Sequence, residues 1–364
     1  MRGHGMTEGT PSGEIWVLGA TGRIGRSVVT RLAGEGIDPV LVGRRRESLV
    51  DLQAGYGGKT GVVVADGGES IADAIRSRKP SVVINLIGNY IETAPAIADA
   101  VMPGGHYTDL ASDATAVPQL LDKHPEAAAA GSTLVTGAGF GVLATESVVA
   151  KLCADRPAPR QVRVDALASV AMEAGVIGAP FASAMVGTLL NGGLRYENGQ
   201  LVKTRLGADP QRLTLPDGET AKSGGIPMGE LVAAQRASGA PSVSGTSGLA
   251  PTGTLVRAVL PLAATLLSVP PLRRLAVRQM AKATTKAAPR PRQHSWGHAV
   301  LTWPDGTVRE GWLRADDGMD YTAAVITEVA LRLARGEGKP GAYTPAAAFG
   351  PDLAVSAGGT FVLN

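Results

Sequence analysis

Short apolar runs alternate with helical patterns through the first part of the chain. The apolar runs are rich in Val, Ile and Leu, and strands are expected at 14–19, 39–42, 61–65, 81–87 and 132–136. Helices are expected between them at 23–32, 47–53, 71–76, 95–101 and 115–121. Continuous apolar strands that alternate with helices are typical of a parallel sheet covered on both faces. Residues 14–150 are therefore predicted to form a Rossmann-type, doubly wound α/β domain.

The pattern changes to longer alternating segments beyond residue 160. Asn198-Gly199 and Asp305-Gly306 lie between such segments, and both dipeptides favour two-residue hairpin loops. We expect residues 151–317 to form an α+β substrate or dimerisation domain with an antiparallel sheet. Within this domain, 240–294 is expected to be a basic, apolar insertion. A helical pattern at 321–335 predicts that the last segment, 318–364, returns to the first domain.

Composition agrees with a two-domain globular protein. A length of 364 residues suits about two domains. The single cysteine, Cys153, excludes a disulfide framework and a thiolate metal cluster, and it fits a reducing, cytoplasmic location. Residues 1–13 contain no apolar segment of the kind found in signal peptides, so we expect no signal peptide there and place these residues outside the fold.

Positive charge is concentrated in one segment. No Asp or Glu occurs between Glu230 and Asp305, whereas nine cations do: Arg236, Arg257, Arg273, Arg274, Arg278, Lys282, Lys286, Arg290 and Arg292. Such asymmetry is informative about partners. An anionic part of the substrate, an acidic carrier protein and an anionic membrane surface would each be attracted. Nucleic acid is not expected, because aromatic residues are 4% of the chain and none interleaves with these cations before Trp296. A solvated loop is the alternative.

An apolar stretch at 255–272 lies within the basic segment. It carries Arg257, is interrupted by Pro261 and Pro270, and is shorter than the roughly 20 residues of a membrane-spanning helix. With the cations that follow, 255–292 is expected to make peripheral contact with a membrane or to line an apolar tunnel. Burial in the core or in a dimer interface is the alternative.

A glycine-rich motif follows the first predicted strand and begins the first helix. Gly19 permits a tight turn, Gly22 lets the backbone approach a diphosphate, and Gly25 allows the helix to pack closely on the strand. The free N–H groups of Thr21, Arg23, Ile24 and their neighbours would face the anion. The context of strand, turn and helix indicates a dinucleotide site.

The end of the second predicted strand indicates which dinucleotide is bound. An NAD site usually has Asp or Glu at this position. Here Arg44 and Arg45 follow the strand, and a guanidinium can bind a 2′-phosphate with two charge-assisted hydrogen bonds. We therefore predict NADP, with Arg44 as the main contact and Arg45 as the second. Asp66, after the third strand, is placed to accept a hydrogen bond from the adenine amino group, although a turn aspartate is equally consistent.

Further segments resemble a known family. In order and spacing, 82–90, 104–110 and 136–141 resemble the saccharopine dehydrogenase-like oxidoreductases, and 318–323 with 343–350 resembles their trans-acting enoyl reductase branch. The resemblance implies an α+β catalytic domain, a nicotinamide-dependent reductase and a homodimer. Two departures concern loops near the nicotinamide. Asn89 replaces a proline that is usual in the family, and the segment from Gly141 to Glu146 lacks the usual aspartate and Ser-Asp ending.

Candidate catalytic groups lie after the fourth and fifth strands. We assign the backbone of Gly88, Asn89 and Tyr90 to the nicotinamide side, because ligands of such sheets lie beyond the carboxyl ends of the strands. Tyr107 is a candidate proton donor, with Asp109 or His106 as its proton supply. A structural anchor formed by the Tyr-Asp pair is an equal alternative. Tyr321, where the second domain rejoins the first, is the other candidate donor.

Other catalytic arrangements are not supported. No Tyr is followed four residues later by Lys, and no Gly-x-Ser-x-Gly motif occurs. His294 and His298 are four residues apart, but no carboxylate near them in the sequence completes a metal site, so no metal is expected. Cys153 lies in a helical pattern and is expected to be packing.

These observations predict an NADPH-dependent reductase of an activated, enoyl-type C=C bond on an apolar or carrier-bound substrate. The first alternative is imine or C–N chemistry of the saccharopine type, which would need arginines that recognise an amino acid, such as Arg163, Arg195 and Arg205. The second is an NADP-binding sensor or cyclase without redox turnover.

Overall fold

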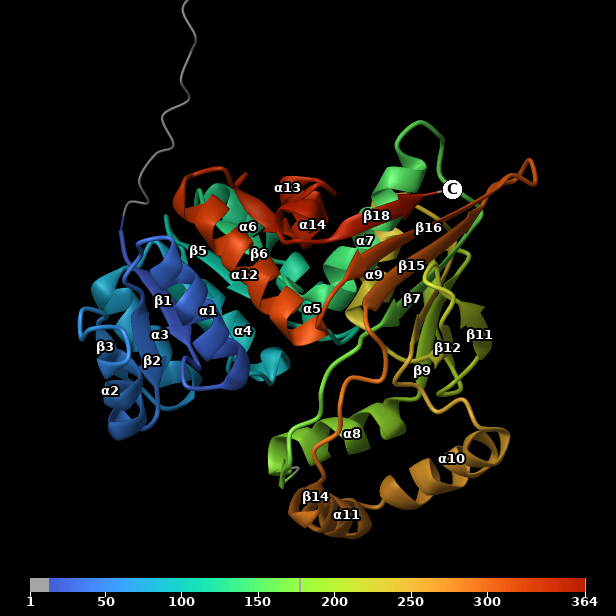
Figure 1. The fold of residues 1–364 in the computed structure, drawn as a ribbon, viewed down its shortest axis with the longest axis horizontal. Helices are drawn as coiled ribbons and strands as arrows, with labels where there is room; N and C mark the ends of the chain where they lie inside the picture. The colour runs from blue at the N-terminus through green and yellow to red at the C-terminus, as the bar shows by residue number, and fades with distance from the viewer. Residues whose placement is uncertain (1–12, 177, 364) are drawn as a thin grey trace, which may run out of the picture. The chain divides into compact units, whose positions relative to one another are not determined.

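The computed structural model describes residues 13–176 and 178–363, so most of the N-terminal segment expected outside the fold, residues 1–12, lies outside the described residues. The chain divides into two compact units (Figure 1). Unit 1 contains the residues up to Ala111 together with Pro118–Ala138 and Thr322–Phe349. Unit 2 contains Ser112–Val117, Gly139–Tyr321 and the chain from Gly350 onward.

A seven-stranded parallel sheet forms the centre of unit 1. The strand order is β17-β6-β5-β4-β1-β2-β3, so the direction of winding reverses between β1 and β4. The strands are β1 (Ile15–Leu18), β2 (Val40–Gly43), β3 (Val62–Val64), β4 (Val82–Asn85), β5 (His106–Asp109), β6 (Thr133–Val135) and β17 (Gly341–Tyr343). The predicted Rossmann-type sheet is confirmed, while the sequence missed β5 and β17.

The helices of unit 1 cover this sheet and alternate with its strands. They are α1 (Arg23–Gly34), α2 (Arg46–Ala54), α3 (Gly67–Arg78), α4 (Tyr90–Val101), α5 (Ala116–Leu121, which begins in unit 2), α6 (His124–Ala129), α12 (Gly318–Ala334, which also begins in unit 2) and α13 (Pro345–Phe349). Helix α4 begins five residues before the predicted start, because Asn89 in the left-handed region ends the preceding loop. Of the predicted return at 318–364, only Thr322–Phe349 belongs to unit 1. Residues 318–321 and the chain from Gly350 onward belong to unit 2, because the last strand, Thr360–Leu363, pairs with the sheet of that unit.

Unit 2 is built on a mixed nine-stranded sheet. Its main order is β10-β9-β13-β7-β15-β16-β18, and β12 joins β13 to β11. The strands are β7 (Gln161–Leu167), β9 (Gly193–Glu197), β10 (Gln200–Thr204), β11 (Gln211–Thr214), β12 (Thr220–Gly225), β13 (Ser242–Ser247), β15 (Ser295–Thr302), β16 (Val308–Ala315) and β18 (Thr360–Leu363). Most neighbours are antiparallel, as expected, but the central pair β13 and β7 is parallel. The expected insertion at 240–294 therefore contains a central strand of the sheet.

Two groups of helices belong to unit 2. The first packs on the sheet and consists of α7 (Phe140–Cys153), α9 (Gly229–Ser238) and α14 (Leu353–Ser356). The second packs together at one end of the unit and consists of α8 (Ala179–Asn191), α10 (Thr254–Leu267) and α11 (Pro270–Lys282), beside the short pair β8 (Gly175–Val176) and β14 (Thr284–Thr285) (Figure 1). Because α7 belongs to unit 2, the structural boundary at Gly139 precedes the expected boundary at 150.

One of the two predicted hairpin loops is confirmed. Asn198 and Gly199 both have positive φ and connect β9 to β10 directly. The second prediction is wrong in its length. Trp303 and Thr307 close the connection between β15 and β16 by a backbone hydrogen bond, and of the Asp305-Gly306 dipeptide only Gly306 has positive φ. The loop is longer than two residues because strand pairing ends at Thr302 and Val308.

Within the described ranges, no single helix is both long enough and apolar enough to cross a membrane. Helices α10 and α11 reach that length and hydropathy only as a pair, and a bend of 117° separates them.

Candidate functional site

The turn from β1 into α1 admits only glycine at two positions, Gly19 in the loop and Gly25 in the first turn of α1. Gly19 has a φ of 76°, and a Cβ atom there would lie 3.1 Å from the carbonyl oxygen of Leu86. A Cβ on Gly25 would lie 2.4 Å from the Gly19 carbonyl oxygen, which is closer than any side chain tolerates. The backbone of Gly22 donates to Gly19 at 3.0 Å and closes the turn. The loop therefore has the close helix-to-strand packing of a dinucleotide site.

Helix α1 begins at this loop without a side-chain cap. A helix N-terminus carries partial positive charge, and its free backbone N–H groups can donate hydrogen bonds to the oxygens of a diphosphate. Thr21, Arg23 and Ile24, which the sequence assigned to the cofactor, line this turn and are only half-buried. Arg26 was missed by the sequence analysis; its guanidinium donates to the Thr21 carbonyl oxygen and adds a cation beside the loop.

Arg44 and Asp66, which the sequence assigns to the adenosine side, lie together at the ends of neighbouring strands. The Arg44 Nε and Asp66 Oδ1 atoms are 4.0 Å apart, and the two side chains are 78% and 76% exposed. Ion pairs this exposed are worth little, so the guanidinium is available to a phosphate. Arg45 is also exposed and immediately precedes α2. The structure thus brings a guanidinium to the place where a 2′-phosphate is expected.

The segment after β4 has an unusual backbone at the predicted nicotinamide side. Gly88 and Asn89 both have positive φ, and Asn89 directly precedes α4. The hydroxyl of Thr93 donates to the Gly88 carbonyl at 3.0 Å and holds this turn. Burial raises the pKa of the Tyr90 phenol, and the negative charge of Asp109 raises it further. Tyr90 therefore stays protonated at neutral pH and can act as a hydrogen-bond donor.

A buried polar network joins the carboxyl ends of β4, β5 and β6. Asn85 Nδ2 donates to the Tyr107 hydroxyl at 2.9 Å, and that hydroxyl donates to Asp109 Oδ2 at 3.0 Å. The other carboxylate oxygen, Asp109 Oδ1, accepts from the Thr136 hydroxyl and from the backbone N–H groups of Ala111 and Gly137. Burial raises the pKa of Asp109, and these hydrogen bonds oppose the rise.

This network corresponds to the anchor alternative of the sequence analysis. Tyr107 and Asp109 are both fully buried, and the Tyr107 hydroxyl already has a donor and an acceptor. Asn85 Oδ1 also accepts from the backbone of Ile87, so the network fixes the loop that leads to Gly88. His106 begins β5 and accepts from the Thr133 backbone with Nδ1. Because neighbouring side chains of a strand point to opposite faces of the sheet, the His106 ring does not lie beside the Tyr107 hydroxyl that it was expected to supply with a proton.

Tyr321, the other candidate donor, is also held in place. Its hydroxyl donates to the Ala354 carbonyl oxygen at 2.8 Å, and its ring makes an edge-to-face contact with Phe140. Burial raises the pKa of this phenol. A proton transfer from Tyr321 would have to break an existing hydrogen bond.

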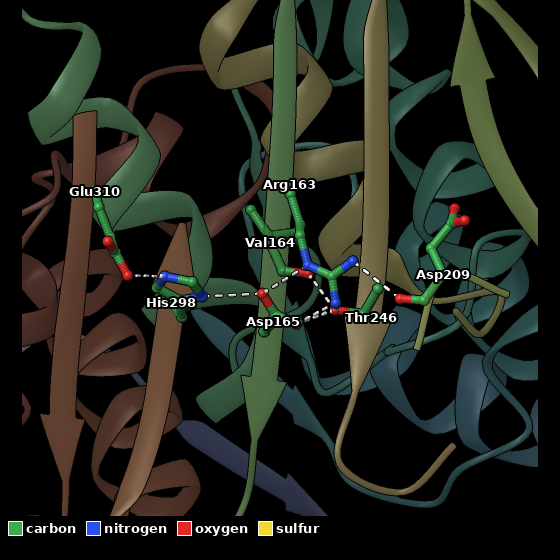
Figure 2. A network of polar contacts seen from close by, with 7 residues as sticks. All are labelled: Arg163, Val164, Asp165, Asp209, Thr246, His298 and Glu310. Atoms are coloured by element: carbon green, nitrogen blue, oxygen red, sulfur yellow. Dashed lines mark hydrogen bonds and ion pairs between the residues drawn. The ribbon is translucent and has the colours of Figure 1, made fainter. Parts of the chain in front are cut away.

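A second polar network crosses the sheet of unit 2 (Figure 2). Arg163 and Asp165 on β7 form a buried ion pair, with Arg163 Nη2 donating to Asp165 Oδ1 at 2.8 Å. His298 Nδ1 lies 2.9 Å from Asp165 Oδ2, and its Nε2 lies 2.9 Å from Glu310 Oε1. Despite the desolvation that opposes it, contact with His298 and Arg163 holds the pKa of Asp165 well below its usual value.

The arginines proposed to recognise an amino acid are mostly engaged elsewhere. Arg163 also donates to the Asp209 carbonyl and to the Thr246 hydroxyl, so its donors are used within the sheet. Arg195 forms ion pairs with Glu197 and with Asp209. Arg205 is exposed. Of the three, Arg163 is therefore structural, and a substrate carboxylate would have to compete for Arg195.

Glu230 was not identified from the sequence. It lies in the first turn of α9 and is 5% exposed, and its Oε2 has no hydrogen-bond partner. A Cβ atom on Gly141 would lie 1.9 Å from Glu230 Oε1, so the glycine leaves the room that this carboxyl fills. Burial raises the pKa of Glu230 to about 7. A carboxyl that titrates near neutral pH is suited to proton transfer.

The two histidines considered for a metal do have carboxylate neighbours, contrary to the expectation from the sequence. His294 Nδ1 lies 3.1 Å from Asp316 Oδ1, and His298 contacts Asp165 and Glu310 from opposite sides of its ring. Asp165 lies on β7, Glu310 on β16 and Asp316 just after β16, so the pairing of these strands with β15 brings the carboxylates to the histidines. Over the residues that the structure describes, no group of three His, Cys, Asp or Glu could hold a metal ion. Cys153 is half-buried, and burial raises its thiol pKa to about 11.

Comparisons with known proteins agree with the geometry of unit 1. Residues 15–135 match the model of the saccharopine dehydrogenase NADP-binding domain. A search of curated proteins finds no match. Among solved structures, apo saccharopine dehydrogenase (L-Glu forming) from Saccharomyces cerevisiae has 12% identity and a TM-score of 0.63, with 97% of this chain and all of that chain covered. The likeness shows a common fold across both units.

Other solved structures match only a part of the chain. Serine dehydrogenase from Escherichia coli is 15% identical over 34% of this chain and 80% of its own, with a TM-score of 0.30. A 3-hydroxyacyl-CoA dehydrogenase type-2 from Mycobacterium avium is 15% identical over 34% of this chain and 72% of its own, also with a TM-score of 0.30. The match of residues 15–135 to an NADP-binding domain model identifies NADP as the cofactor and indicates an NADP-dependent oxidoreductase.

Proposed function

We propose that the protein reduces an activated double bond with NADPH. The observation that carries this proposal is the glycine loop at the uncapped start of α1, with the exposed Arg44 at the end of the next strand. Gly19 to Gly25 would hold the diphosphate, Arg44 and Arg45 the 2′-phosphate, and the backbone of Gly88 to Tyr90 the nicotinamide side. When bound, NADPH supplies a hydride, and a proton from the protein or solvent completes the two-electron reduction.

The side chains of unit 2 favour an apolar or carrier-bound substrate with a C=C bond. Arg163 is consumed by its buried contacts, and a substrate carboxylate would have to displace Arg195 from two partly exposed ion pairs. We therefore propose reduction of an enoyl-type C=C bond, as the resemblance to the trans-acting enoyl reductase branch implies.

Imine or C–N chemistry is the second candidate, because the comparisons favour it. The matched NADP-binding domain is named for saccharopine dehydrogenase, and the structure of that enzyme covers both units of this chain. In this case Arg205 or a displaced Arg195 would bind the substrate carboxylate.

Turnover assays separate the candidates. NADPH absorbance is followed with enoyl thioesters, with imines formed from 2-oxo acids and amino acids, and without substrate. Oxidation with the thioesters alone supports C=C reduction, and oxidation with the imines alone supports the second candidate. Tight NADP binding without any turnover contradicts both and favours a non-redox sensor or cyclase. A homodimer and a cytoplasmic location stay predictions.

The proton donor is tested in the same assay. Tyr107→Phe and Tyr321→Phe remove hydroxyls that are already hydrogen-bonded, whereas Glu230→Gln removes a carboxyl with a pKa near neutral. We expect the pH dependence of kcat to change in Glu230→Gln if that carboxyl supplies the proton. Unchanged pH profiles in all three variants would assign the proton to solvent or to another group.

A further inference from the structure

Helix α10 presents apolar side chains to solvent. Along its outer face the residues recur at intervals of four and three, which places them in one stripe. Their exposed fractions are 84% for Leu255, 59% for Val259, 62% for Leu262 and 53% for Leu266. None of the residues of α10 is fully buried. An exposed stripe of large aliphatic side chains marks an interaction surface.

Helix α11 adds positive charge next to this stripe. Arg274, Arg278 and Lys282 recur every four residues and are all exposed, while Leu272 and Leu275 continue the exposed apolar surface. The two helices pack on each other and on α8 at one end of unit 2 (Figure 1). We name Thr254–Leu267 and Pro270–Lys282 together the basic helix pair.

The structure separates the nine cations of the basic segment into two groups. Four of them have local roles. Arg257 packs its side-chain carbons against Gly207, and Arg236 lies on α9. Arg292 donates to the carbonyls of Leu167 and Ala168, and Arg290 lines a hollow with Asp316, Asp317 and Asp320. The others are exposed on or just after α11, and they are Arg273, Arg274, Arg278, Lys282 and Lys286. These cations are available to an external partner.

We propose that the basic helix pair docks on the surface of an anionic lipid bilayer. The aliphatic stripe of α10 would enter the boundary between headgroups and acyl chains, and the cations of α11 would contact lipid phosphates. With 14 residues, α10 is about 21 Å long, so lying flat on the surface suits it and spanning does not. The bend of 117° between the helices likewise fits an interfacial position.

Charge argues against a second copy of the chain as the occupant. A two-fold dimer places the same patch on both sides of the interface. The segment from 231 to 304 contains no Asp or Glu, so the exposed cations of one copy would meet those of the other. A nucleic acid is disfavoured because neither helix carries an aromatic side chain on which bases could stack. An anionic bilayer satisfies both the apolar stripe and the cations.

Vesicle flotation with the full chain tests the proposal. We expect the protein to float with vesicles of phosphatidylcholine mixed with phosphatidylglycerol and to stay behind with phosphatidylcholine alone. Removing the stripe with Leu255→Ser, Val259→Ser, Leu262→Ser and Leu266→Ser together should abolish binding. Vesicle affinity should fall roughly fivefold for each single substitution, Arg274→Gln, Arg278→Gln or Lys282→Gln. Added salt should also lower the vesicle affinity of the parent, because it screens the charges.

Matched controls come from the same unit. Arg212→Gln with Lys222→Gln removes two exposed cations that face each other across β11 and β12, and Val308→Ser removes an exposed aliphatic side chain from β16. These variants should bind vesicles as the parent does. NADPH affinity and circular dichroism verify that every variant is folded.

Three results would overturn the proposal. The first is equal binding to neutral and anionic vesicles that the Gln variants leave unchanged. The second is capture by an acidic carrier protein without any vesicle binding. The third is self-association that the four serine substitutions abolish, again without vesicle binding.

Discussion

Two buried aspartates of this protein differ in what surrounds them. Asp109 in unit 1 accepts hydrogen bonds from neutral donors, namely two hydroxyls and two backbone N–H groups. Asp165 in unit 2 faces the Arg163 guanidinium and the His298 ring. Both side chains are fully buried, yet the pKa of Asp109 is raised and that of Asp165 is lowered.

The difference shows how a buried carboxylate is stabilised. Desolvation raises the pKa of both aspartates. The neutral donors around Asp109 only reduce this rise, whereas the cation beside Asp165 reverses it. Glu230 extends the comparison, because one of its carboxyl oxygens has no partner and its pKa rises to about 7. The three carboxyls should respond differently to neutralisation and to pH.

The largest effect is expected for Asp165→Asn. The substitution leaves Arg163 buried without its counter-charge, and the new amide N–H group faces a donor, either Arg163 or His298. The free energy of unfolding should therefore fall by about 3–5 kcal/mol at neutral pH. The pKa of Asp165 is lower in the folded protein than in the unfolded chain. The ionised carboxylate therefore stabilises the fold at pH values above the unfolded pKa, and this stabilisation is lost as the pH falls below about 4. Urea unfolding of parent and variant should therefore converge in acid. Asp209→Asn, which changes an exposed carboxylate, is the control, and a loss below about 1 kcal/mol in Asp165→Asn would refute the prediction.

Glu230→Gln is expected to stabilise the protein. The folded pKa is raised above the unfolded one, so this group lowers stability as the pH rises between about 4.5 and about 7. At about pH 8 the variant should be more stable than the parent by ~3 kcal/mol, and near pH 4 the two should be equal. Thermal unfolding at both pH values measures this, with the exposed Glu219→Gln as control. A destabilised variant at pH 8 would show that the Glu230 charge has a partner.

Asp109→Asn should have the smallest effect of the three. An amide oxygen can still accept from Thr136, Ala111 and Gly137, so the loss should be about 1 kcal/mol. Because the folded pKa of Asp109 is raised, the parent loses stability as the pH rises above about 4, and the variant should lack that slope. Urea unfolding across this pH range tests both points. A loss as large as that of Asp165→Asn would remove the distinction between the two networks.

Much of unit 1 could be predicted from the sequence because its signals are local. The apolar runs identify β1, β2, β3, β4 and β6, and the spacing of Gly19, Gly22 and Gly25 identifies the cofactor loop. Arg44 and Asp66 also follow strands that pair directly, so their approach could be anticipated. Strand β5, with the sequence His-Tyr-Thr-Asp, was missed because its buried side chains are polar, and Tyr107 and Asp109 are stabilised there by hydrogen bonds from distant residues.

Unit 2 was less predictable because its contacts are distant in sequence. Arg163, Asp165 and His298 meet only because β15 pairs with β7 across more than a hundred residues. The room for the Glu230 carboxyl depends on the absent side chain of Gly141, which is distant in sequence. The charge asymmetry of the basic segment was visible in the sequence, but only the structure separates the exposed cations from those with local roles.

The central claim is that the guanidinium of Arg44 selects the phosphorylated dinucleotide. Equilibrium binding of NADPH and NADH to the parent protein and to Arg44→Ala tests it most directly, with Arg46→Ala as an exposed control on the same segment. The parent should prefer NADPH, and Arg44→Ala should lose at least about tenfold in NADPH affinity while NADH affinity stays the same. Equal affinities in the parent, or an unchanged preference in Arg44→Ala, would contradict the account.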